Sequence, residues 1–132
     1  GKGAFKNDKQ ISIHKEKPLY KIVGINSSGS SPKLMSRLAP IFKKHHHIRH
    51  LGANALEMAM FAEGLIDIFI DLRKKIRIQD LAGGYILIKE AGGLILDENL
   101  KPLDSDLSYE TRLSFVAASS KNTLDEIISL IK

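Results

Sequence analysis

The 132-residue chain has the length of one domain and is long enough to bury a hydrophobic core. With 43% hydrophobic and 27% charged residues it has the composition of a globular protein, and it contains no apolar run of the roughly 18 residues that a membrane span requires. It has no cysteine, which excludes disulfides and thiolate metal sites. Together with the absence of an apolar leader, this leads us to expect a cytoplasmic protein.

The formal charge of +5 and the pI near 9.5 have two interpretations. One is attraction to phosphorylated ligands or nucleic acid, and the other is an ordinary lysine-rich surface. The basic residues are scattered through the chain, and three Tyr and five Phe offer few stacking surfaces. We therefore favour the second interpretation and expect neither a nucleic-acid platform nor a membrane partner.

The predicted elements alternate between strands and helices. In chain order they are a hairpin at 1–13 turning at Asn7–Asp8, a charged connector at 14–18, a strand at 19–26, a helix at 32–43 opened by Pro32, a strand at 46–51, a helix at 54–63, a strand at 65–72, a basic turn at 73–75, a helix at 79–91, a strand at 94–97, a turn at 98–102, a strand at 114–118 and a helix at 121–131 with Asn122 or Thr123 near its cap. This alternation predicts one α/β domain in which helices cover a sheet.

The segment from Arg49 to Asn54 places the end of a predicted strand against the start of a helix. Gly52 and Ala53 have little side-chain bulk, so the first N–H groups of the helix could approach an anion such as phosphate. The alternative is a plain strand-to-helix turn that Asn54 caps, and the spacing alone favours this alternative.

Three aspartates are candidates for chemistry. Asp80 lies where the helix at 79–91 begins, and it can either cap that helix or present a carboxylate to Mg²⁺. Asp71 ends a predicted strand, where it could accept hydrogen bonds from sugar hydroxyls or pair with Arg73. Asp67 alternates with apolar neighbours, and we expect it at the surface.

The histidines at 45–47 and His50 suggest a metal site, but successive residues of a strand face opposite sides and no cysteine supports them. We interpret them as surface histidines. The chain also lacks a Gly-x-Ser-x-Gly elbow, a Walker loop and a Gly-x-Gly-x-x-Gly motif after a strand.

Taken together, four segments resemble the inositol monophosphatase family, including its archaeal members that also act on fructose 1,6-bisphosphate. They are residues 49–56 (RHLGANAL), similar to Arg-x-x-Gly-Ser-Ala-Ala-Leu; 62–68 (AEGLIDI), similar to Ala-x-Gly-x-x-Asp-Ala; 79–84 (QDLAGG), similar to Trp-Asp-x-Ala-Ala-Gly; and 88–93 (IKEAGG), which ends in the family's Glu-Ala-Gly-Gly. Residues 1–7 also resemble the family's Gly-x-Gly-Ala-x-x-Asn-Gly hairpin. The order and spacing of these motifs make the resemblance specific.

The resemblance implies the C-terminal α/β layer of the sugar-phosphatase fold, with a mostly parallel sheet flanked by helices. It also implies a Mg²⁺ cofactor, a phosphorylated small-molecule substrate and a homodimer. Asp80 matches the family's metal-binding carboxylate, Gly52 and Ala53 match the backbone beside the substrate, and Asp71 lies where the family often contacts substrate hydroxyls. The spacing from Asp71 to Asp80 resembles that of archaeal members more than that of animal members.

The sequence departs from the family pattern at Gln79 (usually Trp), Gly83 (usually Ala) and Asn54 (usually a small residue). It also lacks the family's Gly-Glu-Glu and Asp-Pro-x-Asp-Gly-Thr motifs, which supply most metal ligands. We therefore expect the C-terminal domain of a larger phosphatase, without the N-terminal metal-binding domain and inactive in isolation. A hairpin that begins at residue 1 also leads us to expect a fragment. The alternative is a non-catalytic binding or dimerisation module that kept the fold.

Overall fold

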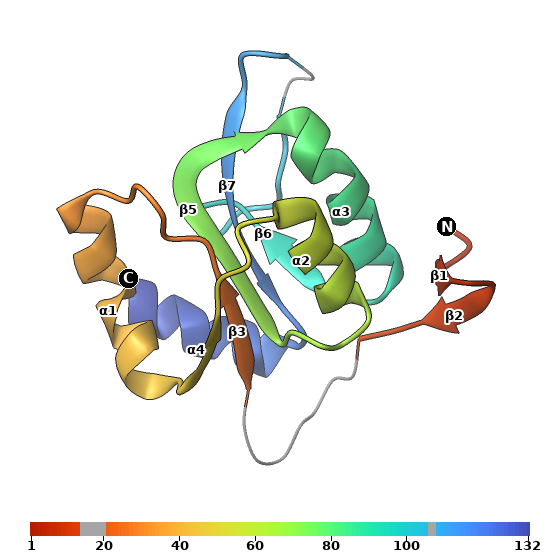
Figure 1. Ribbon diagram of the computed structural model, residues 1–132, viewed down its shortest axis with the longest axis horizontal. Helices are drawn as coiled ribbons and strands as arrows, with labels where there is room; N and C mark the ends of the chain where they lie inside the picture. Colours follow the sequence, from red (N-terminus) through yellow and green to blue (C-terminus); the bar gives the residue numbers. More distant parts are fainter. Residues whose placement is uncertain (14–20, 106–107) are drawn as a thin grey trace.

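The computed structural model describes residues 1–13, 21–105 and 108–132 (Figure 1). The connector expected at 14–18 and the first two positions of the strand expected at 19–26 lie outside the described residues. The described elements are β1 (Ala4–Lys6), β2 (Lys9–Ile11), β3 (Ile22–Ile25), α1 (Pro32–Lys44), β4 (His47–Arg49), α2 (Asn54–Ala62), β5 (Ile68–Arg77), α3 (Ile78–Glu90), β6 (Leu94–Leu96), β7 (Arg112–Ala118) and α4 (Lys121–Ile131). The predicted α/β alternation is confirmed.

A five-stranded sheet in the order β4-β3-β5-β7-β6 forms the centre of the molecule. Strands β4, β3 and β5 are parallel, β7 is antiparallel to β5, and β6 is antiparallel to β7. Strand β7 alone is therefore reversed among the strands of this sheet, which agrees with the mostly parallel arrangement expected. Strands β1 and β2 form the predicted hairpin as a separate two-stranded sheet.

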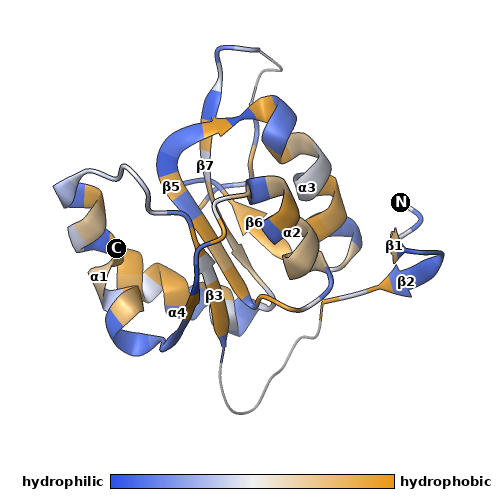
Figure 2. Ribbon diagram, viewed as in Figure 1, coloured by the Kyte–Doolittle hydropathy of each residue, from blue (hydrophilic) through white to orange (hydrophobic). Residues whose placement is uncertain are grey.

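Each face of the sheet carries its own hydrophobic core. Strand β5 shows how this arises, because its side chains alternate: Ile68 and Ile70 belong to the core that includes residues of α1 and α4, whereas Phe69 belongs to the core that includes residues of α2 and α3. Both faces are covered, so the strand is apolar at successive positions, as is usual for buried parallel strands. Figure 2 shows the hydrophobic colour in β3 and the first half of β5, and the hydrophilic colour in the curved second half of β5 and in the turn of the β1–β2 hairpin.

The helix caps agree in part with the sequence. Pro32 opens α1 behind a Ser31 side chain that accepts a hydrogen bond from the Leu34 N–H. The N-cap of α4 is Ser120, whose hydroxyl accepts a bond from the Thr123 N–H. Thr123, predicted near that cap, is its hydrogen-bond partner, and the capping residue itself was not predicted.

Two further predictions are wrong. The basic turn expected at 73–75 is part of β5, which continues to Arg77 with a register irregularity between Asp71 and Ile76. Asp67 is only 3% exposed and not at the surface; its carboxylate accepts a hydrogen bond of 2.8 Å from the Ile22 N–H. That bond joins the start of β3 to the residue before β5 and explains why a carboxylate is stable there. Among the described residues, no helix combines the length and apolar character needed to cross a membrane.

Candidate functional site

The turn between β4 and α2 is built around Gly52. Gly52 has a φ of +74°, a backbone conformation that glycine adopts without strain. Ala53 is the N-cap of α2, and no side chain caps this helix. Asn54 is the first helical residue, so the prediction that Asn54 caps the turn is wrong. Its side chain instead turns toward the sheet.

Glu57, which is completely buried, fixes this turn from inside the helix. One of its carboxylate oxygens accepts the Leu51 N–H and the other accepts the Ala53 N–H, both at 3.3 Å. Glu57 thus reaches back to the N–H of the N-cap residue, as the glutamate of a capping box does, but from the fourth helical position and without a Ser or Thr at the N-cap. The Ala53 N–H is therefore occupied, and an anion at this helix end would meet the N–H groups of Asn54 and Ala55, for which the described part of the chain provides no acceptor.

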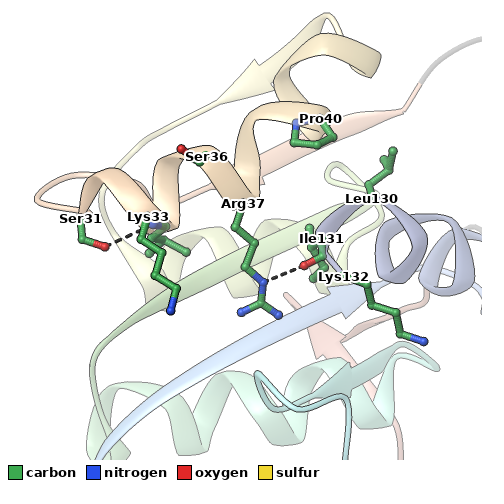
Figure 3. Close-up of a pocket in the computed structure, with 9 residues that line it drawn as sticks. Ser31, Lys33, Ser36, Arg37, Pro40, Leu130, Ile131 and Lys132 are labelled. Carbon is green, nitrogen blue, oxygen red and sulfur yellow. Dashed lines mark hydrogen bonds between the residues drawn. The ribbon is translucent and has the colours of Figure 1, made fainter.

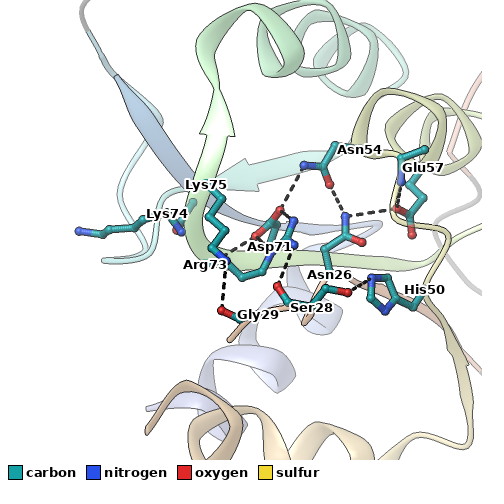
Figure 4. A network of polar contacts seen from close by, with 12 residues as sticks. Asn26, Ser28, Gly29, His50, Asn54, Glu57, Asp71, Arg73, Lys74 and Lys75 are labelled. Atoms are coloured by element: carbon teal, nitrogen blue, oxygen red, sulfur yellow. Dashed lines mark hydrogen bonds and ion pairs between the residues drawn. The ribbon is translucent and has the colours of Figure 1, made fainter. Parts of the chain in front are cut away.

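Asp71 is completely buried, and its carboxylate holds two of the side chains around the start of α2 in place (Figure 4). Its oxygens accept two bonds from the Arg73 side chain, at 2.9 and 2.7 Å, and one from the Asn54 amide at 3.1 Å. Asn54 in turn accepts a bond from Asn26, which directly follows β3. The proposed alternative pairing of Asp71 with Arg73 is confirmed, whereas contact with a substrate hydroxyl remains a prediction.

The pairing has an electrostatic consequence for Arg73. Its hydrogen bonds to Asp71 raise the pKa of the guanidinium above its ordinary value, although burial acts in the opposite direction. Arg73 also donates to the Ser28 carbonyl at 3.2 Å, so three sides of the guanidinium are held. Arg73, Asn26 and Glu57 were not predicted as site residues. A glutamate in the first turn of the predicted helix at 54–63 was the one available signal.

Asp80 lies in the first turn of α3, where its carboxylate accepts a bond of 2.9 Å from Arg77 Nε. No side chain caps α3, so the alternative in which Asp80 caps that helix is wrong. The side chain is 44% exposed, and a partly exposed ion pair of this kind contributes little to stability. Asp80 is therefore accessible to another ligand.

Three of the four predicted site residues, Gly52, Ala53 and Asp80, line one pocket of about 300 Å³. It is lined by Gly52, Ala53, Asn54, Ala55, Arg73, Lys75, Ile76 and Asp80. It lies at the carboxyl ends of the parallel strands, since residues 50–53 follow β4 and β5 extends beyond its last pairing with β3, at Ile70. Ligands of open α/β sheets bind at this edge. The structure therefore brings Gly52, Ala53 and Asp80 together and places Asp71 beneath them, through Arg73 and Asn54.

A larger pocket, of about 600 Å³, lies between α1 and the end of α4 (Figure 3). Arg37 crosses it and donates to the Ile131 carbonyl at 2.7 Å. None of the predicted site residues lines this pocket. We assign the site to the smaller pocket, because size alone identifies no chemistry.

Asp80 is the one carboxylate among the residues that line the smaller pocket. No group of three or more histidine, cysteine, aspartate or glutamate side chains arranged to hold a metal occurs among the described residues. His45, which we expected at the surface, is 8% exposed, and its Nε2 lies 3.2 Å from a carboxylate oxygen of Glu126, so that expectation is wrong for this residue. Asp80 fits one position in the shell of a hard cation, which takes one or two carboxylates from protein together with water and phosphate oxygens.

Comparisons with known proteins agree with this geometry. The sequence profile of the inositol monophosphatase family matches residues 1–132. A fructose-1,6-bisphosphatase/inositol-1-monophosphatase of Methanocaldococcus jannaschii is 37% identical over 99% of the chain and 50% of its own length. A fructose-1,6-bisphosphatase of Pyrococcus furiosus is 35% identical over the whole chain and 49% of its own length. A solved inositol monophosphatase–fructose 1,6-bisphosphatase superposes with a TM-score of 0.85 at 36% identity, covering 98% of the chain and 50% of that structure. The chain spans about half the length of these relatives.

Proposed function

Because the chain belongs to the inositol monophosphatase family, we propose that it supplies part of the substrate and metal site of a magnesium-dependent phosphomonoesterase. The substrate would be an inositol phosphate or fructose 1,6-bisphosphate. In this hydrolysis a water oxygen bonds to phosphorus, the ester P–O bond breaks, and the water's proton goes to the departing alkoxide oxygen. The products are an alcohol and inorganic phosphate.

One observation carries this proposal: the Asp80 carboxylate and the uncapped start of α2 face the same pocket. Asp80 would leave its ion pair with Arg77 and bind a cation through its carboxylate. The N–H groups of Asn54 and Ala55 would orient an anionic group of the substrate. Asp71 would act from beneath by holding Arg73 and Asn54 in place. A bound Mg²⁺ would supply water activation and charge neutralisation.

The remaining metal ligands would come from the other half of the enzyme. The relatives are about twice as long as this chain, and the described residues place one carboxylate at the pocket. We therefore propose that the chain is a C-terminal domain, that the absent N-terminal domain completes the metal site, and that the chain by itself turns over no substrate.

The substitution Asp80→Asn in the complete protein tests this function. Asparagine has almost the same shape, so the fold should be retained, but a neutral amide is a poor ligand for a hard cation. Even outer-shell changes cost metal sites about 10–100-fold, so we expect kcat with saturating Mg²⁺ to fall by about a hundredfold or more. The matched control is Asp125→Asn. It removes a similar exposed ion pair on a helix, the one between Asp125 and Lys121 on α4.

Asp125→Asn should leave turnover unchanged. Equal turnover in wild-type and Asp80→Asn protein would show that Asp80 only forms the surface ion pair with Arg77 and binds no metal. If neither form hydrolyses a phosphomonoester, the chain would be the non-catalytic module that the sequence left open.

A further inference from the structure

The larger pocket, between α1 and the end of α4, is lined by two basic side chains from α1. Lys33 and Arg37 are four residues apart, so they are neighbours on the surface of the helix. Figure 3 shows both side chains leaving α1 on the same side. No aspartate or glutamate is among the described residues that line this pocket. One wall of the pocket is therefore positively charged.

This placement of charge is unfavourable for helix α1 by itself. Like charges four residues apart repel each other, and a cation in the first turn also opposes the helix dipole. The first turn of α1 contains no acidic residue that would offset Lys33. Within the described part of the chain, the side-chain partners of Arg37 are backbone carbonyls and not carboxylates. An anion bound in the pocket would offset both charges.

Arg37 is held in place for such a ligand. Its Nε donates to the Ile131 carbonyl at 2.7 Å, and one of its terminal nitrogens donates to the Glu98 carbonyl at 3.4 Å. A guanidinium has further N–H donors beyond these two, and their planar arrangement matches the oxygens of a phosphate group. Donors that are already fixed bind an anion with little loss of side-chain entropy.

The rest of the pocket is largely apolar. Leu34, Pro40, Leu130 and Ile131 line it, and its volume of about 600 Å³ suits a small molecule. From this combination we infer that the pocket binds a small organic phosphate, with the phosphate group at Lys33 and Arg37 and the carbon body against the apolar side chains. This ligand would be separate from the substrate of the proposed function, because the two pockets share no lining residue.

Calorimetry with two phosphonates tests the site in the complete protein, with divalent metal chelated. Phenylphosphonate and methylphosphonate have the same charged head, and neither contains an ester bond that could be hydrolysed. Only the phenyl group is large enough to cover the apolar side chains. We expect phenylphosphonate to bind about tenfold more tightly, the effect of partly burying one ring.

Substitutions on α1 locate the binding. Lys33→Gln should weaken phenylphosphonate binding about tenfold, the effect of one charge-assisted hydrogen bond. Lys43→Gln is the matched control, because it removes the same charge from the last turn of the same helix, outside the pocket. It should leave the affinity unchanged. Arg37→Lys keeps the charge but loses the planar set of donors, and it should also weaken binding.

Thermal unfolding without phosphonate checks that each variant is folded. An unchanged affinity in Lys33→Gln, equal weakening by Lys33→Gln and Lys43→Gln, or equal affinities for the two phosphonates would each overturn the inference. Lys75→Gln distinguishes the two pockets, since Lys75 lines the pocket of Asp80. It should leave phenylphosphonate binding unchanged, and a loss in Lys75→Gln but not in Lys33→Gln would place the anion in that pocket instead. Asp80→Asn should also leave this binding unchanged, so the organic-phosphate site and the proposed metal role can fail separately.

Discussion

At the scale of single residues, the site depends on two buried carboxylates whose hydrogen bonds fix the residues that line the pocket. Asp71 and Glu57 are both 0% exposed, and together they accept bonds from Arg73, Asn54, Asn26 and the turn before α2. Buried polar groups of this kind are stable only when their partners are complete. Neither side chain lines the pocket, yet together they position the backbone and side chains that do.

Glu57 provides a test of this scaffold. In Glu57→Gln one carboxylate oxygen becomes an NH₂ group, which would face an N–H donor of Leu51 or Ala53. We expect the free energy of unfolding to fall by about 1–3 kcal/mol, the cost of leaving a buried donor unsatisfied. Urea unfolding followed by circular dichroism measures this change.

The matched control is Glu63→Gln on the same helix, where the carboxylate pairs with the exposed Lys6. A surface pair of this kind contributes little, so the change should stay within about 0.5 kcal/mol. If both variants unfold at the same urea concentration as the wild type, Glu57 does not hold the turn.

The sequence predicted the exposed part of this site better than the buried part. Gly52, Ala53 and Asp80 could be located because strand ends and helix starts can be read from local patterns. Asn54 and Asp67 were misassigned because their side chains bond to residues distant in the chain, Asn26 and Ile22. Local spacing contains no information about such partners, and the same holds for the bonds of Glu57.

At the scale of elements, strand β5 determines both the core and the site. Its first half is apolar and was predicted as a strand, whereas its basic second half was predicted as a turn. The charged residues 73–75 lie in the register irregularity between Asp71 and Ile76, and the pairing with β7 resumes beyond them, with Ile76 opposite Leu113 and Arg77 opposite Arg112. Strand propensity depends on such neighbours more than on the residue itself, so composition alone could not reveal the extension.

Helices α2 and α3 approach closely at one of two adjacent glycines. A Cβ on Gly84 would lie 2.8 Å from the Met58 Cβ and 2.0 Å from its sulfur, whereas a Cβ on Gly83 would have no neighbour within 4 Å. Gly84 therefore permits the packing of the two helices. Gly83, where the family pattern has alanine, has no such steric role.

This difference predicts opposite effects of the same substitution. Gly83→Ala should raise the free energy of unfolding by about 0.5–1 kcal/mol, because alanine loses less entropy in a helix. Gly84→Ala should lower it by about 1–3 kcal/mol through overpacking against Met58. Thermal and urea unfolding of the two variants side by side provide the measurement. Equal stabilisation by both would show that α2 and α3 are not in close contact at Gly84.

At the scale of the whole molecule, the described residues form a sheet with a core on each face and, at one edge of it, the pocket in which we propose a metal site. Both faces of the five-stranded sheet have buried cores. The pocket at its carboxyl edge, in contrast, contains one carboxylate that is still paired with Arg77. We propose that Asp80 exchanges this partner for a metal ion when the other half of the enzyme is present.

A crystal structure of the complete protein soaked in Mn²⁺, a stand-in for Mg²⁺ with a usable anomalous signal, tests this claim most directly. We expect an anomalous peak bonded to an Asp80 carboxylate oxygen at about 2.1 Å, the distance typical of Mg²⁺. Arg77 should have moved off the carboxylate. A peak held entirely by other residues, with Asp80 still bonded to Arg77 as it is here at 2.9 Å, would contradict the account.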